Sequence, residues 1–192
     1  MDYVVTVAEN IKTDTFQYGL AMIFSHLFAG HSLFADNCAN SKTILLTLIG
    51  FAIYQFASTA AGIDKIGPSF IRVTLDDTLK FATAMFFAKL LSEPSQVISS
   101  EFGLGTLHLM LSFGIYNLIL SKYLISKIVK SVEPEMRLSH IMALNDTFKF
   151  IFVLLLTGIL NNLNGIGKLN LEYLRLTIGY AFGIVGFDLF FA

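Results

Sequence analysis

The stretch "DDTLKF" at residues 76–81 has two close counterparts in the chain, "NDTFKF" at 145–150 and "TDTFQY" at 13–18. In each, a threonine directly follows an aspartate, and a lysine or glutamine comes three residues after that aspartate. A second motif follows each of them: "FAIYQF" at 51–56, "FGIYNL" at 113–118 and "FGIVGF" at 182–187. The aspartate and the first phenylalanine of the second motif are 37, 36 and 36 residues apart. The same pair of motifs therefore occurs three times at nearly one spacing.

The composition of the chain indicates that its main solvent is lipid. Of 192 residues, 55% are hydrophobic and only 14% are charged, with a mean hydropathy of +0.68. A soluble domain usually carries about 25% charged residues. The net charge of -1 gives no basic excess for binding nucleic acid. The single cysteine, Cys38, excludes an intrachain disulfide and a cysteine-rich metal site.

Three segments are apolar and long enough to cross a membrane. Residues 43–63 and 102–121 contain no charged side chain, and residues 176–192 contain only Asp188. Crossing about 30 Å of hydrocarbon at about 1.5 Å per residue takes about 20 residues, so each of the first two is sufficient for one helix. The third is slightly shorter, and its acid lies near its end.

The segments that precede these three are less uniform. Residues 15–35 are apolar, but the apolar runs 79–91 and 148–160 have only 13 residues each and are too short to span. Extending them back to Pro68 and Pro134, which suit the first turn of a helix, gives helices over about 68–92 and 134–162. The extension places the Asp and Lys of each repeated motif inside the span.

We therefore predict an all-α integral membrane protein with six transmembrane helices in one membrane domain, residues 1–192. Three tandem helical hairpins, over about 2–66, 67–132 and 133–192, would share one direction of insertion. Parallel repeats of this kind imply a pseudo-threefold axis along the membrane normal.

The distribution of Lys and Arg predicts that both termini are cytoplasmic. The membrane face on which both termini are expected has nine Lys and Arg residues: Lys12, Lys65, Arg72, Lys80, Lys122, Lys127, Lys130, Arg137 and Lys149. The opposite side carries four: Lys42, Lys89, Lys168 and Arg175.

The repeated motif predicts a polar layer inside the membrane. Asp77 and Lys80, like Asp146 and Lys149, are three residues apart, so they share a helix face and can pair. The expected layer comprises Asp14, Gln17, Gln55, Asp77, Lys80, Asn117, Asp146 and Lys149, with Gly186 in the corresponding position of the third hairpin and Asp188 just after it. From the helical rise per residue, we expect the acids to lie roughly 9 Å deep in the hydrocarbon core, measured from the membrane face on which the termini lie.

A second interpretation places the motif at the membrane surface. Asp and Thr are common at helix starts, so "TDT", "DDT" and "NDT" can also be three N-caps, with Lys80 and Lys149 extending to the headgroups. The first copy fits this interpretation, because residues 15–35 can span alone. The other two copies would be left with spans of 13 residues.

Two functions remain open at this stage. A polar layer inside three hairpins predicts a channel or transporter for a small ion or polar solute, mildly favouring cations. The alternative is a structural subunit of a membrane complex or of the inner membrane of a virion. The expected partners are the lipid bilayer and, laterally, other membrane subunits or a second copy.

We expect no enzyme activity, cofactor or metal site, since His26 and His31 are five residues apart and no catalytic constellation is present. Gly179 and Gly183 form a GxxxG pattern typical of close helix packing.

Overall fold

The computed structural model describes residues 2–33, 39–63, 69–121 and 138–190, and within these ranges the chain is helical with no strand. The helices, in chain order, are α1 (Asp2–Ala29), α2 (Ala39–Ala61), α3 (Ser69–Ser92), the short 3-10 helix η2 (Pro94–Gln96), α4 (Ser100–Ile115), the π-helical turn η3 (Tyr116–Leu120) that continues α4, α6 (Leu138–Leu163) and α7 (Leu171–Phe190). The all-helical fold class is confirmed.

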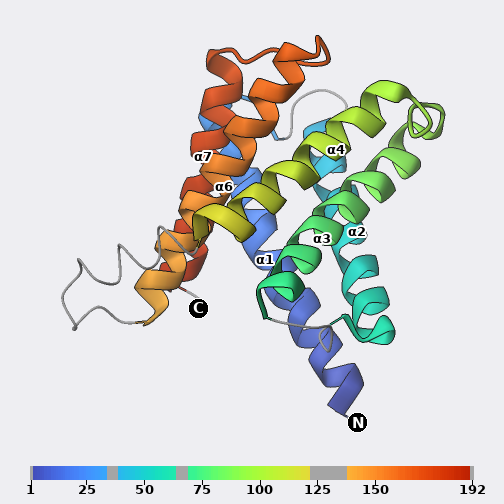
Figure 1. The fold of residues 1–192 in the computed structure, drawn as a ribbon, viewed down its shortest axis with the longest axis vertical. Helices are drawn as coiled ribbons and strands as arrows, with labels where there is room; N and C mark the ends of the chain where they lie inside the picture. The colour runs from blue at the N-terminus through green and yellow to red at the C-terminus, as the bar shows by residue number, and fades with distance from the viewer. Residues whose placement is uncertain (1, 34–38, 64–68, 122–137, 191–192) are drawn as a thin grey trace.

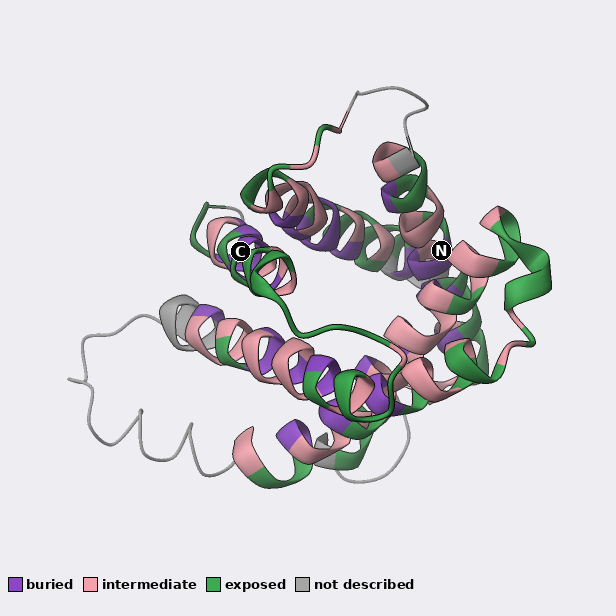
Figure 2. Cartoon of the chain, turned by 90° about the horizontal axis from the view of Figure 1, so that it is seen from above, coloured by how far each residue is buried: buried purple, intermediate pink, exposed green. Residues whose placement is uncertain are grey.

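The long helices form a closed ring. Each of α1, α2, α3, α4, α6 and α7 packs against the next one along the chain, and α7 packs against α1. The segments that join α3 to α4 and α6 to α7 lie at one end of the molecule, and the N-terminus lies at the other (Figure 1). Along each helix, buried residues alternate with exposed ones (Figure 2). Each helix therefore has one face in the ring interior and one face outside.

Four of the described helical segments are long and apolar enough to cross a membrane. They are Asn40–Ala61, Ser100–Leu120, Ala143–Leu163 and Leu171–Phe190. The helices α1 and α3 fall outside this set, and both carry several charged residues. Four such segments in a chain of this composition are typical of an integral membrane protein.

The helix boundaries differ from the predicted ones mainly in α1. That helix begins at Asp2, well before the predicted apolar start at residue 15. The first glycine in it is Gly19, and it contains no proline, so nothing in the polar segment 2–14 interrupts a helix. In α2 the helix ends at Ala61, directly before Gly62, whose φ of 68° stops it.

Small residues bring two pairs of helices into backbone contact. A Cβ atom on Gly183 would lie 2.7 Å from the backbone nitrogen of Ala21, and one on Gly179 would lie 2.7 Å from the Cα of Ser25. The GxxxG pattern of α7 thus packs directly on α1, which confirms the predicted packing role. Gly50 of α2 makes an equally close approach to Ala84 of α3.

Aromatic side chains fill the centre of the ring. The rings of Tyr18, Phe81 and Phe150 contact one another edge-on, with centroid distances of 5.0, 5.8 and 5.4 Å for the three pairs. Phe51 stacks on Tyr18, and Phe113 stacks on Phe81. Each member of the central triad comes four residues, about one helical turn, after the aspartate of the repeated motif.

Several residues behind the predicted orientation lie outside the described ranges. They are Lys65, Lys122, Lys127, Lys130 and Arg137. Cys38 and the two prolines expected at helix starts, Pro68 and Pro134, lie outside them as well.

Candidate functional site

The repeated acids lie in the interior of their helices. Since α3 begins at Ser69 and α6 at Leu138, Asp77 and Asp146 are each about two turns from the helix start, and Asp14 is further still from the start of α1. The interpretation of the motifs as N-caps is therefore wrong. Hydrogen bonds within the helix already occupy the backbone donors that a cap would satisfy.

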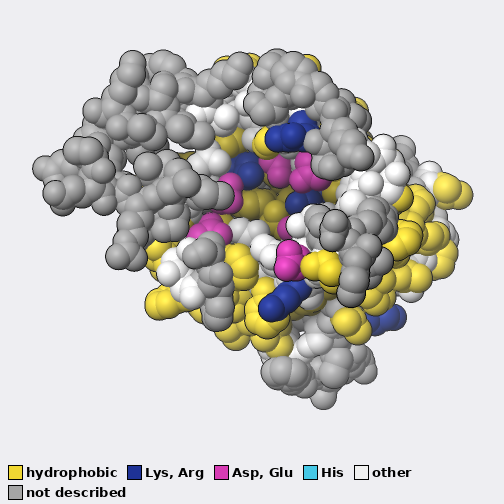
Figure 3. Space-filling view, turned by 90° about the horizontal axis from the view of Figure 1, so that it is seen from below, with side chains coloured by type: hydrophobic (Ala, Val, Ile, Leu, Met, Phe, Trp, Pro, Cys, Tyr) yellow, Lys and Arg dark blue, Asp and Glu magenta, His cyan; other side chains and the backbone are white. Residues whose placement is uncertain are grey.

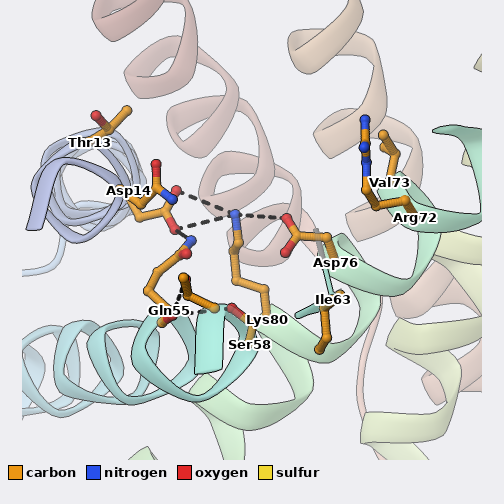
Figure 4. Close-up of a pocket in the computed structure, with 11 residues that line it drawn as sticks. Thr13, Asp14, Gln55, Ser58, Ile63, Arg72, Val73, Asp76 and Lys80 are labelled. Atoms are coloured by element: carbon orange, nitrogen blue, oxygen red, sulfur yellow. Dashed lines mark hydrogen bonds and ion pairs between the residues drawn. The ribbon is translucent and has the colours of Figure 1, made fainter. Parts of the chain in front are cut away.

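The first cluster joins α1, α2 and α3. The carboxylate of Asp14 accepts a hydrogen bond from Nε2 of Gln55 and lies 3.2 Å from Nζ of Lys80. Lys80 also lies 3.3 Å from the carboxylate of Asp76, so its ammonium group bridges two acids (Figure 4). Asp14, Gln55 and Lys80 are all buried. Asp76 is partly exposed and accepts a further hydrogen bond from the hydroxyl of Tyr54 at 2.9 Å.

The second cluster joins α3, α6 and the π-helical turn that follows α4. Asp77 accepts a hydrogen bond from Nδ2 of Asn117 at 2.9 Å and lies 3.2 Å from Nζ of Lys149. Lys149 also lies 3.0 Å from Asp146. Its ammonium group therefore bridges two acids, as that of Lys80 does. Asp77, Asn117 and Lys149 are buried, and the side chain of Asp146 is about a quarter exposed.

The two clusters follow one rule. In each cluster, an acid accepts a hydrogen bond from an amide on the next helical segment along the chain. The same acid forms an ion pair with the lysine of the next repeated motif, on α3 for Asp14 and on α6 for Asp77. Buried charges are tolerated in an apolar interior only when they are paired and hydrogen-bonded. Each cluster meets that condition with side chains from three helical segments, and so ties those segments together.

The partners of the lysines differ in part from the predicted ones. The expected pair of Asp146 with Lys149 is present, but Lys80 bonds Asp14 and Asp76 rather than Asp77. On a helix, positions three and four residues away share a face, so Lys80 can reach either acid. The prediction also left Asp76 outside the layer, whereas it lies 3.3 Å from Lys80.

Helices α1 and α7 form a polar contact at Gln17 and Asp188. Nε2 of Gln17 donates to Oδ1 of Asp188 at 3.0 Å, and both residues are buried. Asp188 is 42 residues after Asp146, close to the separations of 41 and 40 residues between acid and amide in the first two clusters. Asp188, not Gly186, is therefore the counterpart of Gln55 and Asn117.

This correspondence also affects the interpretation of the motif "FGIVGF" at residues 182–187. Phe182 is 56% exposed, whereas Phe51 and Phe113 are 1% exposed. Gly179 and Gly183 lie in close contact with the backbone of α1. This contact fixes the rotation of α7 about its axis, and Phe182 then faces outward. The three motifs are similar in sequence, but the first phenylalanine of the motif in α7 is exposed where those of the other two are buried. The spacing from Asp146 to Asp188 was the signal that could have placed Asp188 correctly.

A polar pocket opens beside the first cluster. Its volume is about 340 Å³. It is lined by Asn10, Thr13, Asp14, Gln55, Ser58, Thr59, Ile63, Arg72, Val73, Asp76 and Lys80. Seen from the end that carries the N-terminus, acidic and basic side chains gather in a hollow of this face (Figure 3). The first cluster therefore lines a polar pocket that opens toward that side.

A second cavity of about 260 Å³ lies on the far side of the aromatic triad and has contributions from all six long helices. Its lining is largely apolar, including Met22, Met85, Leu109 and Val153, with Thr47, Thr157 and Asn161 as polar exceptions. Phe81 and Phe150 belong both to the triad and to the wall of this cavity. The aromatic layer thus separates the central cavity from the ion-pair clusters.

The histidines form hydrogen bonds outside the two ion-pair clusters. His108 bonds Asn161 at 2.7 Å, and His31 bonds His26 at 3.2 Å and Glu172 at 3.0 Å. In the described part of the chain, no group of three or more His, Cys, Asp or Glu side chains is placed to hold a metal ion.

Comparison with models of protein families, with curated protein sequences and with solved structures gives no match.

Proposed function

We propose that this chain is a channel- or transporter-like membrane protein for a small ion or polar solute, with six spans, a pseudo-threefold axis along the membrane normal and both termini in the cytoplasm. The observation that carries the proposal is the arrangement along the ring axis. A polar pocket with buried ion pairs lies on one side of a layer of aromatic rings, and a central cavity lies on the other.

The threefold arrangement is supported by the contacts between hairpins. The helices pack as a ring in chain order, and two successive hairpins are joined by the same acid–amide–ammonium cluster. The residues one turn beyond the three acids, Tyr18, Phe81 and Phe150, meet one another at the centre. Three equivalent positions that converge on one point are expected of hairpins arranged about an axis.

Six spans require α1 and α3 to cross the membrane despite their charges. The buried charges on these helices are paired inside the ring: Asp14 with Lys80, and Asp77 with Lys149. Ionisable groups in a membrane are tolerated when they face the interior of a bundle and neutralise one another. The charges therefore explain why these two helices are less apolar than the other four.

A transport cycle would have to open the aromatic layer. The rings of the triad pack in T-shaped pairs, and its members come from three different proposed hairpins. A small outward movement of one hairpin would separate the rings and join the polar pocket to the central cavity. Apolar constrictions of this kind gate other pores by excluding water.

The test is flux into liposomes that contain the purified protein. We expect uptake of at least one solute from a panel of monovalent cations, protons, anions and small zwitterions. Asp14→Asn should change that uptake, and the exposed variant Phe182→Leu should not. Absence of flux for the whole panel, with the protein shown to be folded and inserted, would refute a transport function.

A structural role is the second candidate, and the short described connections favour it. Residues 93–99 join α3 to α4, and residues 164–170 join α6 to α7, so little of either connection is available to a soluble partner. The outer faces carry large apolar side chains such as Phe16, Phe56 and Phe182. These faces could pack against other subunits within the membrane. Crosslinking in native membranes that yields a stable hetero-complex, together with absent flux, would favour this role.

A further inference from the structure

The third contact between hairpins lacks the cation that the other two contain. Lys80 and Lys149 supply an ammonium group to the first and second clusters. Gln17 lies in the corresponding position of the first motif, three residues after Asp14, and bonds Asp188 instead. A neutral amide thus takes the place of a lysine where α7 meets α1.

The acid at this contact has unused capacity to bind a cation. Asp188 is only 6% exposed, and its Oδ1 accepts the hydrogen bond from Gln17 at 3.0 Å. Its Oδ2 is buried and has no hydrogen-bond partner among the described residues. A second carboxylate, that of Asp146, is close enough to act on Asp188 electrostatically, as Lys149 also does to a smaller extent.

Lys149 does not compensate for the missing cation. Its Nζ lies between Asp77 at 3.2 Å and Asp146 at 3.0 Å. Counting the side chains bonded in the three contacts, the acids are Asp14, Asp76, Asp77, Asp146 and Asp188, and the cations are Lys80 and Lys149. A buried carboxylate without a compensating charge is costly. Each contact thus has one negative charge in excess, and only at the contact of α1 with α7 is there no ammonium group bonded to the acid.

We propose that a small monovalent inorganic cation, Na⁺ or K⁺, binds the free oxygen of Asp188 where α7 meets α1, with the carboxylate of Asp146 nearby, in the place that a lysine ammonium group takes at the other two contacts. Carboxylate oxygens are ligands that hard cations prefer. A divalent ion would need more carboxylates than this contact offers, and one of the two already binds Lys149. The site would serve a transporter or a structural subunit equally, so this inference goes beyond the proposed function.

Thermal unfolding of the purified protein tests the proposal without any assay of transport. Midpoints would be compared in NaCl, KCl and N-methyl-D-glucamine chloride at equal concentration and fixed pH. We expect Na⁺ or K⁺ to raise the midpoint saturably, by roughly 5–10 °C at about 100 times the dissociation constant. Equilibrium binding of ²²Na⁺, with K⁺ as competitor, would measure the occupancy directly.

Two variants locate the effect and one serves as a control. Gln17→Lys supplies a tethered ammonium group, so its midpoint in N-methyl-D-glucamine should approach that of the wild type in the preferred cation, with no further gain from Na⁺ or K⁺. Asp188→Asn should also lose the cation effect and the ²²Na⁺ binding. Glu172→Gln removes an equal charge from the exposed start of α7 and should retain both.

Three results would overturn the inference. The first is the same wild-type midpoint in all three salts, without ²²Na⁺ binding. The second is a cation effect that persists in Asp188→Asn. The third is a wild type that is indifferent to Na⁺ and K⁺ but becomes more stable as the pH falls, because the occupant of the carboxylate would then be a proton. If Gln17→Lys does not fold, Asp188→Asn and the ²²Na⁺ measurement still decide the question.

Discussion

The packing of α1 against α7 and the ion pair that links α3 to α6 stabilise the fold in different ways. In the first, Gly179 and Gly183 let two backbones touch, and the polar pair of Gln17 with Asp188 involves only one charge. In the second, Lys149 bridges Asp77 and Asp146. Close packing of small residues needs no counter-charge, whereas a buried ion pair fails as soon as one partner is lost. The two contacts should therefore respond differently to mutation.

Lys149→Met should have the largest effect. It leaves Asp77 and Asp146 without their shared cation, at a cost of about 3–5 kcal/mol in the free energy of unfolding. The double variant Asp77→Asn with Lys149→Met should recover much of that loss, because it removes a charge along with its partner. Thermal or denaturant unfolding in detergent measures both. Equal, small effects from the single and the double variant would show that the pair is solvated.

Gly183→Val should have the next largest effect, at the other contact. Its side chain would collide with the backbone of Ala21, and overpacking of this kind costs typically 1–3 kcal/mol or more. The matched variant is Gly186→Val on the same helix, where an added Cβ meets nothing within 4 Å. Similar unfolding midpoints for the two variants would contradict the close approach of α7 to α1.

Most of the helix positions could be predicted from the sequence, because apolar runs of about 20 residues and the repeated motifs mark them independently. The partners of the charges could not be fully predicted. Lys80 has acids three and four residues before it and a third acid on α1, and only the folded arrangement of the helices selects Asp14 and Asp76.

The register of the third hairpin could not be predicted for a related reason. The similarity of "FAIYQF" at residues 51–56 to "FGIVGF" at 182–187 aligns Phe182 with Phe51, but the rotation of α7 depends on the contact of its glycines with Ala21 and Ser25 of α1. Those residues are more than 150 positions away in the chain. The sequence thus offers two alignments, one by motif similarity through Gly186 and one by the spacing from Asp146 to Asp188, and only the packing of α7 on α1 decides between them.

Gln17→Ala should have a smaller effect than either change above. It removes one hydrogen bond to a charged group, which is worth about 1.5–3 kcal/mol at most, and the packing of the glycines on α1 remains. Gln55→Ala is the matched change at the first cluster, where Asp14 retains Lys80. We expect Gln17→Ala to cost more than Gln55→Ala in a solution without Na⁺ or K⁺, because Asp188 has no lysine bonded to it. The reverse order in unfolding experiments would contradict that difference between the two contacts.

The smallest effect is expected from Glu172→Gln, at the exposed end of the contact between α1 and α7. The carboxylate of Glu172 lies 3.0 Å from Nε2 of His31, but the two side chains are 55% and 31% exposed. Exposed pairs contribute about 0–1 kcal/mol, because water and salt screen them. Glu93→Gln, which breaks the similarly exposed pair with Lys89 on α3, is the matched control. If α1 and α7 are held by backbone packing, both variants should unfold within about 2 °C of the wild type. A clearly larger loss for Glu172→Gln alone would mean that the contact depends on its surface charges as well as its glycines.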